Sequence, residues 1–182
     1  MTEERLILVD AEDRALGPAT RAACHAGEGL LHRAFSVYLF DADLRLLLQQ
    51  RQDGKTLWPG FWSNSCCSHP RWGEEAPAAA ARRIREELGV GATLEHLWSY
   101  RYQARFADAG SEHELCWVFA GPVDPSAVRA NATEVKDWRF AAPGALDAEI
   151  DDETRYTPWF RIAWRELRAR HWGAVERFAG RR

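Results

Sequence analysis

The sequence predicts an α+β fold in which a mixed or antiparallel β-sheet is flanked by α-helices. Segments typical of strands and of helices follow one another without the regular strand–helix alternation of parallel α/β folds. The chain has 182 residues, of which 46% are apolar and 28% charged, so it can bury a sizeable core. We therefore expect one domain spanning residues 1–182.

The first half of the chain contains a predicted hairpin and the clearest helix. Leu30–Phe40 is predicted to be a strand, followed by a turn at Asp41–Asp43 and a returning strand at Leu44–Arg51. Residues 52–75 are rich in glycine and proline and are interpreted as turns. Ala76–Gly89 is predicted to be a helix, since proline occupies its first turn, alanines follow and a glycine ends it.

The second half contains a second pair of strands and a helical end. Leu94–Phe106 and His113–Gly121 contain several aromatic residues and are predicted to be strands. A short strand is expected at Val135–Phe140. Residues 157–178 are predicted to be helical, with Pro158 in the first turn.

Composition and charge exclude several partners. The net charge of −3 provides no basic field for a nucleic acid. The sequence shows no signal peptide and no apolar run of membrane-spanning length, so we expect no membrane association and a cytoplasmic location. The four cysteines should then be reduced, and a disulfide between adjacent cysteines would be severely strained. The lack of a coiled-coil pattern leads us to expect a monomer.

The stretch "SNSCCSHP" at residues 63–70 is the first candidate functional site. A cysteine beside a histidine can form a metal site, act in catalysis, form a disulfide or simply pack. One alternative is a zinc-stabilised binding module using Cys66, Cys67, His69 and the distant Cys116. Adjacent cysteines fit one tetrahedron poorly, so the sequence disfavours that module.

The predicted helix and its approach, "GEEAPAAAARRIREELGV", form a second candidate site. Carboxylates on one helical face could hold Mg²⁺, which would neutralise and orient a diphosphate. The alternative is a pair of ordinary (i, i+4) ion pairs on a solvated face, Arg82–Glu86 and Arg83–Glu87. The pattern alone leaves both interpretations open.

A third set consists of scattered residues of metal-ligand type: His25, His32, His69, Glu112 and Glu114. If extended, Glu112 and Glu114 point to the same side, where their charges repel unless a cation or proton intervenes. Three imidazoles and two carboxylates would suit Mn²⁺, Mg²⁺ or Zn²⁺. Isolated structural histidines are the alternative.

Taken together, several motifs closely resemble the type I isopentenyl-diphosphate isomerase family of the Nudix superfamily. They are "HRAFSVYLFD", "LWPGFWSNSCCSHP", "ARRIREELGV", "EHELCWVF" and "YTPWF", and the similarity runs nearly end to end. The helix departs from the hydrolytic Nudix box, because Arg83 stands where a glutamate is usual and Gly73 immediately precedes Glu74. Such a site looks suited to holding a diphosphate without cleaving it. A Nudix hydrolase of a nucleoside or prenyl diphosphate remains the alternative.

The resemblance implies a Nudix-like mixed sheet and an activity. The activity is interconversion of isopentenyl and dimethylallyl diphosphate by metal-dependent 1,3-allylic proton transfer through a tertiary carbocation, which supplies isoprenoid biosynthesis. It implies Glu114 as acid, assisted by Tyr102, and Cys67 as base on the opposite face, with Cys66 having no chemical role. We expect nearby cations to lower the pKa of Cys67.

The resemblance also implies a set of binding residues. The ligands of a first metal, Mn²⁺ or else Mg²⁺ or Zn²⁺, are His25, His32, His69, Glu112 and Glu114. Glu87 is implied for Mg²⁺ bound with the substrate diphosphate. The resemblance implies diphosphate contacts for Arg51, Lys55 and Arg83. It also implies one for Arg21, which stands where the family usually has a lysine. Trp159 is implied to face the reacting carbon skeleton.

Overall fold

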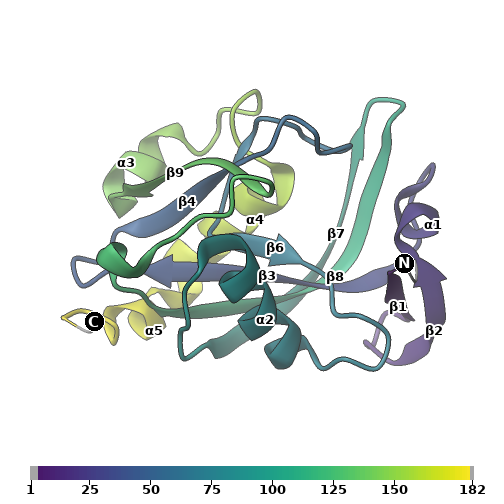
Figure 1. Cartoon of the computed structure of the whole chain (residues 1–182), viewed down its shortest axis with the longest axis horizontal. Helices are drawn as coiled ribbons and strands as arrows, with labels where there is room; N and C mark the ends of the chain where they lie inside the picture. Colours follow the sequence, from purple (N-terminus) through teal and green to yellow (C-terminus); the bar gives the residue numbers. More distant parts are fainter. Residues whose placement is uncertain (1–3, 181–182) are drawn as a thin grey trace.

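The computed structural model describes residues 4–180 and is built around a mixed sheet (Figure 1). The strands are β1 (Arg5–Val9), β2 (Ala15–Thr20), β3 (His32–Phe40), β4 (Leu46–Arg51), β5 (Trp62–Ser63), β6 (Cys66–Ser68), β7 (Glu95–Phe106), β8 (Gly110–Pro122) and β9 (Val135–Ala141). The helices are α1 (Arg21–His25), α2 (Ala76–Leu88), the 3₁₀ turn η1 (Pro125–Ala127), α3 (Pro143–Glu149), α4 (Pro158–Glu166), the π-helical η2 (Leu167–His171) and α5 (Trp172–Glu176).

Strand β3 is the centre of the sheet. It runs parallel to β8 along its whole length, and β8 pairs antiparallel with β7 as a long hairpin. On its other edge β3 meets β1 at His32, β6 at Phe35–Val37 and β4 at Phe40. Strand β4 then diverges to pair with β5 and β9. The prediction of an α+β fold with a mixed sheet is confirmed.

The two faces of the sheet bury different helices. Phe35, Val37 and Leu39 of β3 pack against α2 on one face. The alternate residues Tyr38 and Phe40 pack against α4 on the other face, because successive strand residues point to opposite sides. In Figure 1, α2 lies in front of the sheet and the C-terminal helices lie behind it.

The long, periodic elements match the sequence prediction, and the short ones were missed. Strands β3, β4, β7, β8 and β9, helix α2 and the C-terminal helical region are confirmed, although η2 interrupts that region with a π turn. No prediction covered β1, β2, α1 or α3, and β5 and β6 lie in the segment interpreted as turns. None of the helices within residues 4–180 is long and apolar enough to cross a membrane.

Side chains between the short strands β5 and β6 tie this segment to β3 and β4. The Asn64 side chain donates to the Val37 carbonyl at 3.0 Å. The Ser65 hydroxyl donates to the Leu47 carbonyl at 2.6 Å and accepts from the Leu39 amide at 2.8 Å. Polar side chains therefore bridge the gap that opens between β3 and β4. The strand propensities of individual residues do not predict such bridges.

The end of α2 depends on Gly89. This residue is left-handed, with φ of 69°, and its amide donates to the Arg85 carbonyl at 3.1 Å. The sequence prediction of a glycine stop is confirmed. A Cβ here would lie 2.8 Å from the Cβ of Arg129 and 2.9 Å from its carbonyl oxygen.

We expect Gly89→Ala to lower the free energy of unfolding by about 2 kcal/mol or more. An alanine is strained in the left-handed conformation, and its Cβ would clash with Arg129. Urea unfolding measures this change. Gly91→Ala is the matched control. A Cβ there would meet no atom of the described part of the chain within 4 Å, so this substitution should change stability little. Equal effects of the two substitutions would contradict this account of the helix end.

Candidate active site

The strand register brings the chemically interesting side chains to one face of the sheet. His32 and Ser36 point to the same face of β3, because they are four residues apart on a strand. Ser36 pairs with Cys67 of β6, and His32 pairs with Glu114 of β8. Tyr102 of β7 is the next partner of Glu114. Cys67 and Glu114 therefore project to the same face from strands on opposite sides of β3.

Five residues from four segments form a cluster, which we call the His/Glu cluster: His25, His32, His69, Glu112 and Glu114. The ligand atoms of the first four all lie within 4.8 Å of one another. Glu114 joins them through Oε1, which lies 2.8 Å from Nε2 of His69 and 3.8 Å from Nε2 of His32. The structure thus brings together every residue that the sequence predicted for this metal.

His25 reaches the cluster from α1, a helix that the sequence prediction missed. The Thr20 hydroxyl caps this short helix by accepting from the Ala23 amide at 3.2 Å. His25 then lies at the helix end, with Nδ1 3.1 Å from Oε2 of Glu112. The expected same-side placement of Glu112 and Glu114 is confirmed, since both belong to the extended strand β8.

The His/Glu cluster fits a divalent cation. Within residues 4–180, three buried imidazole nitrogens have no hydrogen-bond partner: Nε2 of His25, Nε2 of His32 and Nδ1 of His69. Burial lowers the pKa of His32 to about 3, helped by the neighbouring His69, and burial likewise lowers the pKa of His69 well below its usual value. Both rings are therefore neutral near pH 7, and the neutral imidazole is the form that binds metals.

Glu114 and Tyr102 form a buried acid–hydroxyl pair. The Tyr102 hydroxyl donates to Oε2 of Glu114 at 2.6 Å. Burial raises the pKa of Glu114, although hydrogen bonds from its neighbours lower it in part. Burial also raises the pKa of Tyr102 well above its usual value. Tyr102 is thus a neutral hydroxyl that can pass a proton to or from Glu114.

Cys67 is held between two polar side chains. Its thiol donates to Oδ1 of Asn64 at 2.9 Å and lies 3.2 Å from the Ser36 hydroxyl. Burial raises the pKa of the Cys67 thiol to about 12, despite opposing effects of these contacts and of Arg51. Arg51 lowers this pKa, as expected of a nearby cation, but burial has the larger effect and sets the net direction.

Cys66 occupies the other side of the same strand. It pairs with Val37 and is completely buried in the cluster formed with α2. The strand alternation that turns Cys67 towards the pocket turns Cys66 away from it. Both thiols are free, as expected. The structure thus separates the two sulfurs and places Cys66 in a packing position.

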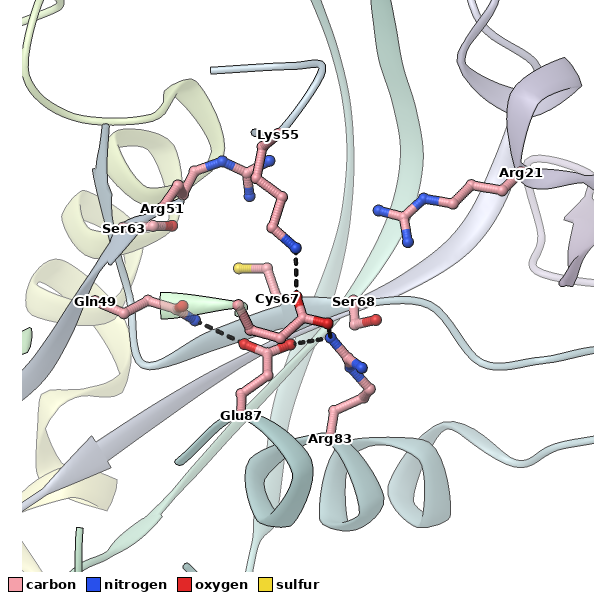
Figure 2. Close-up of a pocket in the computed structure, with 10 residues that line it drawn as sticks. Arg21, Gln49, Arg51, Lys55, Ser63, Cys67, Ser68, Arg83 and Glu87 are labelled. Carbon is pink, nitrogen blue, oxygen red and sulfur yellow. Dashed lines mark hydrogen bonds and ion pairs between the residues drawn. The ribbon is translucent and has the colours of Figure 1, made fainter. Parts of the chain in front are cut away.

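A polar pocket beside Cys67, which we call the cation pocket, gathers all four predicted cations (Figure 2). Its lining residues are Arg21, Gln49, Arg51, Lys55, Ser63, Cys67, Ser68, Arg83, Glu87 and Glu134. In Figure 2 the side chains of Arg21 and Lys55 reach towards Cys67 and Ser68 from above, and that of Arg83 reaches up from α2 below them. Sequence reasoning missed Gln49, Ser63, Ser68 and Glu134, which belong to no recognised charge or ligand pattern.

Both (i, i+4) ion pairs expected for α2 form: Arg82–Glu86 lies outside the cation pocket, and Arg83–Glu87 lines it. Arg82 pairs with Glu86 at 3.1 Å and with Glu74 at 2.8 Å, so these charges form surface ion pairs outside the cation pocket. Glu87 is only 4% exposed; it accepts from Gln49 at 3.0 Å and from Arg83. Its carboxylate lines the pocket, where an oxygen could also bind a divalent cation.

Arg51 links the cation pocket to an aromatic wall. Its guanidinium donates to the Trp58 carbonyl at 3.0 Å and lies 5.3 Å from the ring centre of Trp159. The Trp159 indole donates to the Ser63 hydroxyl at 3.0 Å, which fixes its ring. The Tyr102 ring is 6.3 Å away. Trp159 thus stands between the cations and the Glu114–Tyr102 pair.

Comparison with known proteins assigns the fold. The NUDIX domain family model matches residues 30–161. A crystal structure from Deinococcus radiodurans has a TM-score of 0.74 at 22% identity, over 90% of this chain and 98% of that chain. The MutT protein from Methanosarcina mazei Go1 has a TM-score of 0.63 at 14% identity, over 78% and 95%. The chain is a Nudix-domain protein.

Curated relatives show which family of Nudix-domain proteins the chain belongs to. The isopentenyl-diphosphate Delta-isomerase of Serratia proteamaculans (strain 568) is 41% identical over 178 residues, which cover 97% of each chain. That of Burkholderia multivorans is 43% identical over 159 residues, covering 87% of this chain and 89% of the relative. The chain therefore belongs to the isopentenyl-diphosphate Delta-isomerase family and is an isomerase.

Proposed function

We propose that this protein interconverts isopentenyl and dimethylallyl diphosphate by a divalent-metal-dependent 1,3-allylic proton transfer, with Cys67 and Glu114 as the two proton-transfer groups. The observation that carries the proposal is their placement on one sheet face beside a pocket lined by four cations. The cations fit the diphosphate, and the two proton-transfer groups fit the hydrocarbon end of such a substrate.

The cation pocket would hold the diphosphate. Arg21, Arg51, Lys55 and Arg83 line it from four segments and supply the donors that a diphosphate needs. Glu87 would hold Mg²⁺ bound with the diphosphate. Anchoring the diphosphate at this end would position the hydrocarbon between the two proton-transfer groups.

The proton transfer needs an acid and a base on opposite faces of the allyl unit. In the isopentenyl-to-dimethylallyl direction we assign Glu114, with Tyr102, as donor of a proton to the terminal methylene carbon. Cys67 then takes a proton from the second carbon, next to the one that bears the diphosphate. This step needs the thiolate, which divalent cations bound nearby would favour against the effect of burial. The two groups exchange roles in the reverse direction. The hydrogen bond between Tyr102 and Glu114 supports this pairing.

Metal and aromatic groups would support the charged intermediate. A divalent cation at the His/Glu cluster, Mn²⁺ or else Mg²⁺ or Zn²⁺, would strengthen the acidity of a bound, protonated Glu114. The Trp159 face can stabilise a tertiary carbocation by about 0.5–2 kcal/mol while excluding water. Trp58 packs edge-on against Trp159, with ring centres 5.2 Å apart, and holds that wall in place.

The test of this activity separates isomerisation from hydrolysis. We expect the protein to convert isopentenyl diphosphate with Mg²⁺ and Mn²⁺, followed by proton NMR, without releasing phosphate or pyrophosphate. EDTA should stop the conversion, and added metal should restore it. Arg83 replaces a carboxylate that a water-activating Nudix site would use, which is the reason for expecting no hydrolysis. Metal-dependent phosphate release without isomerisation would contradict the proposal.

The cellular setting follows from the same proposal. The four free cysteines suit a reducing compartment, and we propose the cytoplasm. The partner is a small prenyl diphosphate, and we propose that the protein acts as a monomer without nucleic-acid or membrane partners. Each protomer would hold every assigned group, because all of them come from one chain.

A further inference from the structure

Glu134 is a carboxylate of the cation pocket to which neither the motifs nor the proposed chemistry gives a role. Its Oε2 forms an ion pair with Nζ of Lys55, and its Oε1 lies 3.5 Å from Nη2 of Arg83. Lys55 and Arg83 are two of the four cations proposed to bind the diphosphate. Glu134 therefore contacts the same donors that the substrate would use.

The backbone holds Glu134 at this position. Its amide donates to the Asn131 carbonyl at 2.9 Å, and the Asn131 amide donates to the Glu87 carbonyl at 2.8 Å. The Gln52 side chain fixes the same turn by donating to the Ala132 carbonyl at 2.6 Å. The turn is thus tied both to the end of α2 and to the segment that carries Lys55.

Glu134 is charged in this setting. Partial burial opposes ionisation, but the hydrogen bond and charge of Lys55, together with Arg83, lower the pKa of Glu134 below its usual value. The Glu134 side chain lines the cation pocket, and 26% of its surface is exposed. A carboxylate held here repels an incoming diphosphate while competing with it for Lys55 and Arg83.

We propose that Glu134 makes the cation pocket select a magnesium-bound diphosphate over a metal-free one. The proposal rests on the function proposed above. A metal-free diphosphate carries its full negative charge against Glu134 and Glu87. Mg²⁺ cancels two of those charges, so the complex meets far less repulsion from Glu134 and can use Glu87.

The competing interpretation makes Glu134 only a support that holds Lys55 in place. The two interpretations predict opposite signs. If Glu134 only supports Lys55, its removal weakens the binding of every diphosphate. If Glu134 competes and repels, its removal strengthens the binding of the metal-free anion and changes that of the magnesium complex much less.

The test measures binding of inorganic pyrophosphate by isothermal titration calorimetry, with EDTA in one arm and MgCl₂ in the other, at equal ionic strength. We expect Glu134→Gln to bind metal-free pyrophosphate about tenfold more tightly than the wild type does. Its affinity for the magnesium complex should change by less than about threefold, so its preference for the complex falls. Glu134→Asp, which keeps the charge, should retain the wild-type preference.

Glu86→Gln is the matched control, because Glu86 pairs with Nη1 of Arg83 at 2.8 Å from outside the cation pocket. It should bind both forms as the wild type does. Unchanged or weaker binding of metal-free pyrophosphate by Glu134→Gln would overturn the inference, as would equal strengthening of both forms. Failure of the wild type to bind magnesium pyrophosphate would instead overturn the proposed diphosphate pocket itself.

Discussion

Cys67→Ala is expected to lower kcat for isomerisation by at least about 10³-fold, the contribution of a well-placed proton-transfer group. The thiol sits in the cation pocket beside the donors for the diphosphate, held by Asn64 at 2.9 Å. Removing one sulfur atom leaves those donors and the His/Glu cluster in place. Substrate and metal affinity, measured by calorimetry, should therefore stay close to the wild-type values.

Cys66→Ala is the matched control for this loss. Its sulfur is buried against α2 on the other face of the sheet, so its removal costs packing and not chemistry. We expect nearly normal turnover with a lower midpoint of thermal unfolding. An inactive Cys66→Ala together with an active Cys67→Ala would show that the assignment of the two sulfurs is reversed.

Glu114→Gln should lose two properties at once. Its Oε2 accepts from Tyr102, and its Oε1 contacts His69 and lies near His32. A neutral amide can neither donate the proton as a carboxylic acid does nor supply a negative ligand. We expect kcat to fall by about 10³-fold and affinity for Mn²⁺ to fall by about 10- to 100-fold.

Tyr102→Phe separates the two roles of Glu114. This change removes the hydroxyl hydrogen bond but leaves the carboxylate next to the histidines. Turnover should fall while affinity for Mn²⁺, measured by calorimetry, stays close to the wild-type value. A near-normal rate for Glu114→Gln would refute its assignment as the acid, and unchanged Mn²⁺ affinity would refute its assignment as a ligand.

The resemblance to a known family supplied most of the candidate site, and residue spacing supplied part of its geometry. The i, i+2 spacing of Glu112 and Glu114 correctly placed both carboxylates on one side of an extended segment. The division of Cys66 and Cys67 between two faces depends on strand β6, which lies in the segment interpreted as turns. Pairing between strands is less local: the parallel register of β3 with β8, which sets His32 beside Glu114, depends on segments far apart in the chain. No local pattern fixes such a register.

Other features escaped prediction for physical reasons. Helix α1, which delivers His25, has only five residues, too few for a periodic apolar pattern. Glu134 joins the cation pocket through a turn whose hydrogen bonds reach α2 and the segment after β4. The raised pKa of Cys67 follows from its burial, which neighbouring charges in the sequence do not reveal.

The most direct test of the central claim follows the hydrogens on the second carbon of isopentenyl diphosphate, the carbon next to the one that bears the diphosphate, during reaction in D₂O. Because Cys67 is assigned to remove that proton, the wild type and Cys66→Ala should form dimethylallyl diphosphate with one of these hydrogens lost. Isopentenyl diphosphate recovered after incubation with Cys67→Ala should retain both hydrogens on this carbon. Loss of a hydrogen from this carbon at the wild-type rate in Cys67→Ala would contradict the account.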